Sequence, residues 1–338
     1  MRTLEQLIGR GIVALGKKAK GNPEAFSRGS FAIGVANKDY AAATPLLWNS
    51  AYGVMGLDAE NVRLVGDPER AGEIFDALKA DDRYLGGDVG VGFKDKAWTL
   101  FDAIDPLAKE MQSVNVVVKT SEGSLKGYNT DGIGYSASLE NMLGGRGEKL
   151  RGGTVIVLGG GGTANSIAFA LAMRGAKVVV LNRTAEKARA LAARVNAFFA
   201  SASAAYGGGR DELARFAPQA RAIVSVIDDP KSPLDQYSVL GTIELPVTAE
   251  RIRQNLRDAR EMMGLLKPDT IISDVMLREK PTATLREAAL AGFPTLDGRP
   301  MVLNQAIEAF MLVNEPLLRG RKAGKAEVAR IMEAVRLG

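Results

Sequence analysis

Apolar and polar positions follow two recurring patterns along this chain. Short apolar runs bounded by glycine and polar residues are typical of buried strands, whereas longer segments with an apolar residue at every third or fourth position are typical of helices. Strands are predicted at residues 31–35, 62–65, 89–93, 114–119, 155–158, 177–181, 222–227 and 270–277. Helices are predicted at residues 4–15, 45–55, 68–78, 98–111, 135–143, 163–173, 249–265, 281–291, 304–318 and 325–337. Their alternation predicts an α/β fold.

One stretch, from Val155 to Lys187, combines a strand, a glycine-rich turn, a helix and a second strand. In such a unit a dinucleotide pyrophosphate binds at the N-terminus of the helix. The first glycine allows a tight turn, the second lets the backbone approach phosphate, and a small third residue lets helix and strand pack closely. The expected cofactor-binding residues of this turn are Gly159, Gly161, Gly162, Thr163 and Ala164.

The end of the second strand predicts which dinucleotide binds. An acidic residue at this point usually accepts the free ribose 2′-hydroxyl of NAD. Here the chain has Asn182, Arg183 and Thr184, with Lys187 one turn further on. A guanidinium, a hydroxyl and an ammonium would hold a 2′-phosphate, which a carboxylate would repel. The sequence therefore predicts NADP as the cofactor.

Length and charge narrow the class of protein. A chain of 338 residues is long enough for two domains. The net charge of +5 comes from 44 basic and 39 acidic residues, and because the basic residues are spread out, nucleic-acid binding is not expected. No apolar run is long enough to span a membrane, and there is no apolar signal core. We therefore expect a cytoplasmic protein.

The chain contains no cysteine and no histidine. Thiolate catalysis, Cys/His zinc sites and histidine acid–base chemistry are thereby excluded, and no metal site is predicted. Proton transfer must come from Lys, Asp, Glu, Tyr or a hydroxyl. A lysine whose pKa is lowered, held by a carboxylate, could take the proton of an alcohol as hydride leaves.

Four stretches, in order along the chain, resemble those of the shikimate dehydrogenase family. They are Lys94 followed by Asp105-Pro106-Leu107-Ala108 and Val114-Asn115; Tyr128-Asn129-Thr130-Asp131-Gly132; Gly159 to Gly162 with Asn182-Arg183-Thr184; and Asp297-Gly298 with Met301 and Gln305-Ala306. Together they cover roughly residues 31–313. The resemblance implies reversible hydride transfer between NADP and a ring hydroxyl of a shikimate- or quinate-like acid.

The same resemblance implies a domain organisation and roles for single residues. Residues 1–131, with an N-terminal extension at 1–28, would form an α/β substrate domain, residues 132–299 a doubly wound Rossmann-type NADP domain, and residues 300–338 helices that return to the first domain. Lys94 and Asp131 match the catalytic lysine and aspartate. Asn115 and Gln305 match substrate-contacting positions, and Met301 is expected at the cofactor.

The positions that should hold the substrate carboxylate depart from the family pattern. The usual Ser-x-Ser-Pro is replaced by Ala42 and Thr44 before Pro45, so one hydroxyl is lost and Thr44, also the predicted N-cap of the next helix, remains as a substrate contact. The usual Asn-Val-Thr is replaced by Asp88-Val89-Gly90. Asp88 would lie near the substrate, and its carboxylate is expected to repel an acidic one.

These departures leave two alternatives beside a shikimate- or quinate-like substrate. A methylene-tetrahydropterin dehydrogenase would use lysine and aspartate near the nicotinamide in a related fold. An NADP-binding sensor without turnover would need neither Lys94 nor Asp131. In each case the partner is a small molecule, with no nucleic acid or membrane, and a homo-oligomer is possible. An insertion at residues 239–265 has no assigned role.

Overall fold

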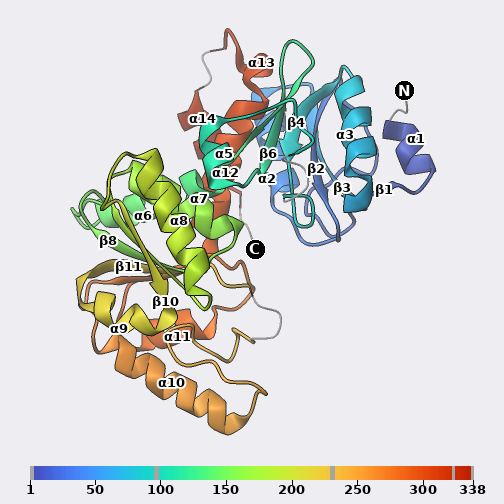
Figure 1. Cartoon of the computed structure of the whole chain (residues 1–338). Helices are drawn as coiled ribbons and strands as arrows, with labels where there is room; N and C mark the ends of the chain where they lie inside the picture. The colour runs from blue at the N-terminus through green and yellow to red at the C-terminus, as the bar shows by residue number, and fades with distance from the viewer. Residues whose placement is uncertain (1–3, 95–98, 229–232, 322–323, 336–338) are drawn as a thin grey trace. The chain divides into compact units, whose positions relative to one another are not determined.

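The computed structural model describes residues 4–94, 99–228, 233–321 and 324–335. The chain divides into two compact units, which are described separately. Unit 1 comprises Met1–Gly134 and Val302–Gly338, and unit 2 comprises Tyr135–Met301 (Figure 1). Each unit contains one sheet with helices packed on it. The predicted α/β class is confirmed.

Unit 1 is built on a seven-stranded sheet of order β1-β3-β2-β4-β6-β7-β5. Its strands are β1 (Val13–Leu15), β2 (Ser30–Ala36), β3 (Ala59–Gly66), β4 (Tyr84–Asp88), β5 (Ala103–Ile104), β6 (Val116–Lys119) and β7 (Leu125–Tyr128). The central strands β3, β2 and β4 run parallel, whereas β1, β6 and β7 pair antiparallel to their neighbours β3, β4 and β6. The carboxyl ends of the three parallel strands therefore meet at one edge.

Helices cover both faces of this sheet. On one face lie α1 (Leu4–Gly9) and α3 (Ala71–Ala80), and on the other lie α2 (Thr44–Met55), α12 (Gly298–Val313) and α14 (Lys325–Glu333). Buried hydrogen bonds join α2 to α12 and the residue after it, because Trp48 Nε1 donates to the Ala306 carbonyl (3.1 Å) and Tyr52 Oη donates to Asn314 Oδ1 (2.8 Å). The C-terminal helices thus complete the core of unit 1.

The N-terminal extension belongs to the core of unit 1. The predicted helix at residues 4–15 is wrong in its second half, because α1 ends at Gly9 and Val13–Leu15 form the edge strand β1. Leu4 and Leu7 are buried in the same cluster as α3. β1 pairs with β3, with Val13 opposite Gly66. Three strand residues are too few for a periodicity to show.

Several other predicted boundaries differ from the structure. Residues 99–105 are not helical, and α5 covers only Pro106–Met111, with Asp105 accepting backbone N–H groups as its N-cap. The strand predicted at 89–93 is wrong: β4 covers Tyr84–Asp88, and residues 91–93 form a turn. The predicted helix at 304–318 is two helices, α12 and α13 (Glu315–Leu318). The predicted ends at Trp98 and Leu337 lie outside the described residues.

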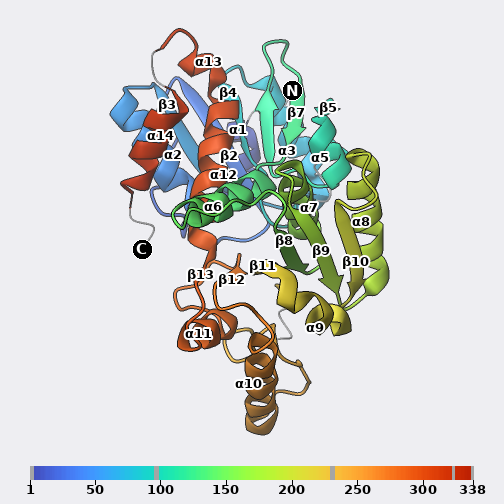
Figure 2. The ribbon, with the colours of Figure 1, turned by 90° about the vertical axis from the view of Figure 1, so that its left-hand side faces the viewer.

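Unit 2 contains a six-stranded parallel sheet of order β10-β9-β8-β11-β12-β13. Its elements are α6 (Asp131–Gly144), β8 (Thr154–Leu158), α7 (Gly162–Met173), β9 (Lys177–Asn182), α8 (Ala185–Phe198), β10 (Ala205–Gly209), α9 (Leu213–Phe216), β11 (Ala220–Ser225), α10 (Ala249–Met263), β12 (Ile271–Asp274), α11 (Ala283–Leu290) and β13 (Thr295–Leu296). The order reverses beside β8, which is the doubly wound Rossmann arrangement (Figure 2).

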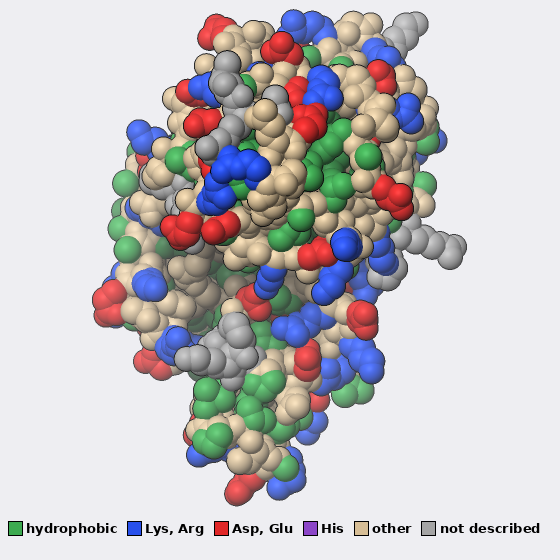
Figure 3. All heavy atoms as spheres, turned by 90° about the vertical axis from the view of Figure 1, so that its right-hand side faces the viewer, with side chains coloured by type: hydrophobic (Ala, Val, Ile, Leu, Met, Phe, Trp, Pro, Cys, Tyr) green, Lys and Arg blue, Asp and Glu red, His purple; other side chains and the backbone are tan. Residues whose placement is uncertain are grey.

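The segment at 239–265 is anchored in unit 2. Val239 and Leu240 are buried with Ala259 and Met263 of α10, in the cluster that also contains Ile223 of β11. No helix within the described residues is long and apolar enough to cross a membrane. On the face drawn in Figure 3, basic and acidic side chains are interspersed.

We expect Leu7→Ala to destabilise the protein by about 2–5 kcal/mol, because the side chain is fully buried and its removal leaves a cavity. Urea denaturation would measure the change. Arg10→Ala is the matched control, since Arg10 makes only a long, exposed ion pair with Glu73 (3.4 Å). Equal stabilities of the two variants would show that the extension adds nothing to the core.

Candidate functional site

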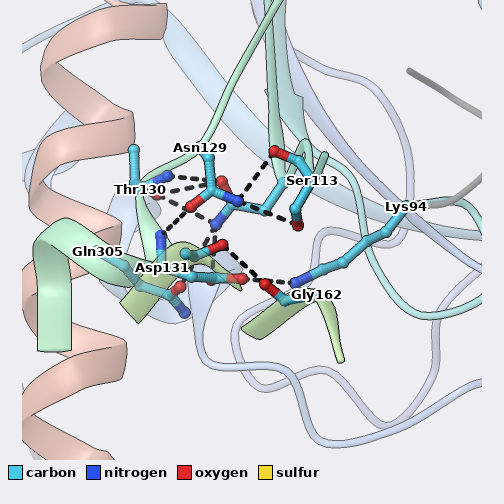
Figure 4. A network of polar contacts seen from close by, with 9 residues as sticks. Lys94, Ser113, Asn129, Thr130, Asp131, Gly162 and Gln305 are labelled. Carbon is cyan, nitrogen blue, oxygen red and sulfur yellow. Dashed lines mark hydrogen bonds and ion pairs between the residues drawn. The ribbon is translucent and has the colours of Figure 1, made fainter. Parts of the chain in front are cut away.

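Lys94 and Asp131 form an ion pair in unit 1. The Lys94 ammonium Nζ lies 2.8 Å from Asp131 Oδ2 and donates a hydrogen bond to it (Figure 4). Lys94 follows the turn after β4, and its side chain is one-third exposed (34%), whereas that of Asp131 is 6% exposed. Asp131 begins α6, where the helix dipole favours a carboxylate. Two residues that are 37 positions apart in the sequence are thereby brought together.

The side chain of Asn115 fixes the other oxygen of that carboxylate. Its amide Nδ2 donates to Asp131 Oδ1 (2.7 Å) and to Thr130 Oγ1 (3.1 Å), and its Oδ1 accepts from the Thr130 backbone N–H (2.8 Å). Gln305 Oε1, on α12, lies 3.4 Å from the same Nδ2. Both oxygens of Asp131 are thus occupied, and the carboxylate has one orientation. Three of these four residues, Asn115, Asp131 and Gln305, were predicted as site residues, whereas Thr130 was named only as part of a motif.

Asn129 supports this arrangement from behind. Its Nδ2 donates to the carbonyl and the hydroxyl of Ser113 (3.1 and 3.2 Å), and its Oδ1 accepts from the Asp131 backbone N–H (3.1 Å). Asn129 and Ser113 are buried. A fully hydrogen-bonded buried network of this kind holds the side chains in one conformation.

The pKa of Lys94 is raised, not lowered. Burial lowers the pKa, but the charge of Asp131 and the hydrogen bond to Asp131 raise it. With the smaller contributions of Tyr40 and Asp88, which also raise the pKa, these effects outweigh burial. The lowered pKa that the sequence analysis expected is therefore wrong. Lys94 is an ammonium at neutral pH, and it can donate a proton to an oxygen that gains negative charge.

Asp88 does not present an uncompensated negative charge. The Arg63 guanidinium, on β3, lies with its Nη1 2.9 Å from Asp88 Oδ2, at the carboxyl end of β4. The pairing with Arg63 reduces the repulsion of an acidic substrate that Asp88 is expected to cause, and that repulsion stays a prediction. Arg63 was not predicted as a site residue. It interrupts an apolar strand, and an arginine in such a position indicates a buried charge that needs an acidic partner.

Glycines make room for this ion pair. Arg63 lies opposite Gly34 in the register of β3 and β2. A Cβ at Gly34 would lie 2.3 Å from Asp88 Oδ1, so the pair crosses β2 only because that position has no side chain. A Cβ at Gly90 would lie 2.8 Å from the Val35 carbonyl oxygen and 3.1 Å from Arg63 Nη1. The threonine usual in the family does not fit at Gly90 without a shift of the backbone.

Tyr40, on the loop before α2, covers the guanidinium of Arg63. Arg63 Nη2 donates to Tyr40 Oη (3.2 Å), and Arg63 Cζ lies 5.1 Å from the centre of the Tyr40 ring. Burial raises the pKa of Tyr40, while the charges of Arg63 and Lys94 act to lower it. The tyrosine therefore lies within electrostatic range of Lys94.

The two residues that replace the family's serines lie next to this cluster in sequence. Ala42 is buried (5% exposed), and its side chain has no hydrogen-bonding group. Thr44 is the first residue of α2 and half-buried, and the N-cap is Ala43 rather than Thr44 as predicted. Of these two positions, only Thr44 carries a side-chain hydroxyl.

In unit 2 the glycine-rich turn joins β8 to α7. Gly161 precedes the first turn of α7, which contains Gly162, Thr163 and Ala164, and Ala164 is fully buried. A Cβ at Gly160 would lie 3.1 Å from the Asn182 amide, so the turn lies against the end of β9. The backbone N–H groups at the start of a 12-residue helix form an anion-binding site.

The end of β9 presents the predicted basic residues to solvent. Asn182 Nδ2 donates to the Thr184 carbonyl (3.1 Å), and Arg183, Thr184 and Lys187 are exposed. Met301, predicted at the cofactor, is buried in the first turn of α12.

Arg210 is a further basic residue at this edge. It follows Gly209, which pairs with Asn182 in the register of β10 and β9. Burial lowers its pKa to about 10. No acidic partner of Arg210 is found in the part of the chain that the structure describes. The sequence analysis missed Arg210 because residues 201–209 carry no clear periodicity.

Comparison with known proteins identifies relatives of both units. The model of the shikimate dehydrogenase substrate binding domain matches residues 36–117, and that of shikimate / quinate 5-dehydrogenase matches residues 143–205. The chain is 30% identical over 272 residues to the shikimate dehydrogenase (NADP(+)) of Methanosarcina barkeri, covering 80% of this chain and 87% of the relative. It is 32% identical over 273 residues to that of Methanosarcina acetivorans, covering 80% and 87%. The crystal structure of shikimate dehydrogenase from Aquifex aeolicus has a TM-score of 0.67 at 27% identity, covering 90% of this chain and 98% of that one.

Asp131→Asn should lower the pKa of Lys94, because it removes the carboxylate that raises this pKa while burial continues to lower it. NMR titration of labelled lysine would measure the shift. Asp102→Asn is the matched control, since Asp102 pairs with the exposed Lys79 (2.7 Å). An unchanged Lys94 titration in Asp131→Asn would contradict the assignment.

Proposed function

The chain belongs to the shikimate dehydrogenase family of oxidoreductases, and on that premise we propose that it transfers hydride reversibly between NADP and a ring hydroxyl or ketone of a shikimate- or quinate-like substrate. The observation that carries the proposal is the Lys94–Asp131 ion pair of 2.8 Å, held by Asn115. It supplies a positioned proton in a chain without histidine.

Lys94 is the proton carrier of the proposed reaction. In the reductive direction the carbonyl carbon gains hydride, and the carbonyl oxygen takes a proton from Lys94 Nζ. In the oxidative direction the neutral amine takes the hydroxyl proton as hydride leaves, so a rising pH favours oxidation. Asp131 keeps the Nζ oriented and stabilises its charge, and it keeps its own orientation through Asn115.

Asn115 and Gln305 are proposed to contact the substrate. Both are amides in the network of Asp131. The two N–H groups of Asn115 already donate to Asp131 and Thr130, so Asn115 can only accept from a ring hydroxyl, whereas the Gln305 amide can donate to a hydroxyl as well as accept from one. Thr44 and Asp88 are proposed contacts at the carboxyl edge of the unit 1 sheet. Unit 1 would therefore bind the substrate.

Unit 2 is proposed to bind NADP, which supplies or accepts the hydride. The donor set fits the group: the turn from Gly159 to Ala164 offers backbone N–H groups to a pyrophosphate, and Met301 would contact the cofactor. Arg183, Thr184, Lys187 and Arg210 offer cations and a hydroxyl at the end of β9, where a 2′-phosphate needs them. A cytoplasmic location and self-association remain predictions.

Wild-type protein is expected to reduce NADP with shikimate or quinate, and Lys94→Ala should lower kcat about 100- to 10,000-fold, because the proton carrier is lost. Absorbance at the NADPH band measures both. Lys79→Ala, which removes an exposed lysine paired with Asp102, should leave the rate unchanged.

Turnover of a methylene-tetrahydropterin alone would replace the proposed substrate. If no substrate supports NADP reduction although NADP binds, an NADP sensor would be favoured. A Lys94→Ala variant with the wild-type rate would remove Lys94 from the mechanism.

Arg183→Ala should weaken NADP binding about 10- to 100-fold and leave NAD binding nearly unchanged, because only NADP carries the 2′-phosphate. Arg210→Ala should act in the same direction. Arg189→Ala, on the helix α8 that follows Arg183, is the control, because this exposed arginine pairs with Glu186 (3.1 Å). Calorimetric titration with each cofactor distinguishes the cases, and an equal loss for NADP and NAD would refute the phosphate assignment.

A further inference from the structure

Arg63 and Asp88 form a neutral pair at the edge of the sheet where the proposed substrate would bind. Asp88 lies opposite Val116 in the register of β4 and β6, and the Val89 N–H donates to the carbonyl of Asn115 (2.8 Å). The pair is therefore one residue away from the network that holds Asp131. The charges of Asp88 and Tyr40 both act on the pKa of Lys94.

While it is paired with Asp88, the Arg63 guanidinium is not available to a substrate carboxylate. Its side chain is 3% exposed, its Nη1 lies against Asp88 Oδ2 (2.9 Å), and its Nη2 donates to Tyr40 Oη (3.2 Å). Asp88 is more exposed, at 19%. Because Asp88 Oδ1 is buried, what the pair offers at its surface is Asp88 Oδ2, and a carboxylate oxygen only accepts hydrogen bonds.

The N-terminal extension keeps Arg63 buried. The Gly16 N–H donates to the Arg63 carbonyl (2.9 Å), and Asn22 Oδ1 accepts from the Arg63 N–H (2.6 Å). A Cβ at Gly16 would lie 2.9 Å from Arg63 Cγ, so the extension is in close contact with the side chain. Asp39, beside Tyr40, accepts the backbone N–H groups of Lys17 and Lys18. The extension therefore contacts Arg63 itself and also Asp39, the neighbour of the Tyr40 that covers the guanidinium.

The same edge lacks two of the three side-chain hydroxyl donors that are usual in the family and that could bind an acid group. Ala42 has no hydroxyl, and Gly90 has no side chain, so Thr44 is the one hydroxyl left at the three positions that the family uses. A carboxylate bound here would be partly desolvated with at most one side-chain donor from these positions, beside a second carboxylate. Such an unpaired buried charge is costly.

We propose that the site selects a ring whose end away from the reacting carbon is uncharged and donates a hydrogen bond to Asp88, and that Arg63 is the positioning residue that holds Asp88 for this purpose. The inference rests on the proposed dehydrogenase function and specifies its substrate class. A neutral end with a hydroxyl or amide group could donate a hydrogen bond to Asp88, and it would face an Arg63–Asp88 pair that has no net charge.

The first test compares three probes that differ only at that end: shikimate, its methyl ester and its primary amide. NADP reduction by wild-type protein should show kcat/KM at least about tenfold higher for the amide than for the acid, with the ester between them, since the ester is neutral but donates no hydrogen bond. The difference should lie mainly in KM, because the Lys94–Asp131 pair is the same for all three. A wild-type preference for the acid would overturn the proposal.

The second test uses Asp88→Asn, which restores the amide usual in the family and leaves the Arg63 charge unbalanced. The ratio of kcat/KM for acid to amide should rise at least about tenfold, because an acidic substrate now supplies the missing negative charge. Asp58→Asn is the matched control: it removes the same charge at the opposite edge, where Asp58 accepts the Gly29 N–H (3.2 Å). Equal ratios in the wild type, Asp88→Asn and Asp58→Asn would refute the role of the pair.

The outcomes separate this inference from the function on which it rests. If the wild type turns over shikimate and its derivatives but prefers the acid, the dehydrogenase function stands and only the substrate class is wrong. If no probe is reduced or oxidised and calorimetry detects no binding of any of them, both fail. Thermal unfolding of each variant shows whether a loss of activity comes from a loss of folded protein.

Discussion

The hydrogen bond from the Asn115 amide to Asp131 Oδ1 (2.7 Å) is the contact on which the proposed active site depends. Asn115 immediately precedes β6, and Asp131 begins α6, so this bond joins the sheet to the helix that leaves it. With Oδ1 held there, Oδ2 is left for Lys94, whose ammonium form follows from that pairing. A different side chain at residue 115 would leave the carboxylate free to rotate, and Lys94 would lose its fixed partner.

Two cation–anion pairs in unit 1 differ in what each leaves exposed. In the Lys94–Asp131 pair the cation is the more exposed member (34% against 6%), and in the Arg63–Asp88 pair the anion is (19% against 3%). Exposure decides which partner can meet a ligand. One pair therefore presents a proton donor, and the other presents a hydrogen-bond acceptor, although each is neutral in sum.

The elements that the sequence predicted well are those whose signals are local. β8, the glycine turn and α7 were predicted to within one residue, because an apolar run, a glycine cluster and a small-residue helix follow one another directly. Lys94 and Asp131 were named from a motif resemblance, and the structure brings them together. Their contact could not be inferred from spacing, since the turn after β4 and the start of α6 meet only in the folded sheet.

The features that the sequence did not reveal depend on contacts between distant segments. The Arg63–Asp88 pair crosses β2, and neither residue alone indicates the other, although an arginine in an apolar strand and an unexpected aspartate are complementary signals. The direction of the pKa shift of Lys94 was also predicted wrongly. Burial lowers this pKa and a neighbouring carboxylate raises it, and only the geometry shows which effect is larger.

The approach of Asp88 to Gly34 also bears on how such a site could change during evolution. Any residue larger than glycine at position 34 is excluded while Asp88 Oδ1 lies 2.3 Å from the place of its Cβ. Loss of Arg63 as a first step would leave a carboxylate without its counter-ion in the interior. Loss of the Asp88 charge first would leave a cation that an acidic ligand can balance. A lineage that exchanges one specificity for the other therefore has a permissive order of substitutions, and it begins at residue 88.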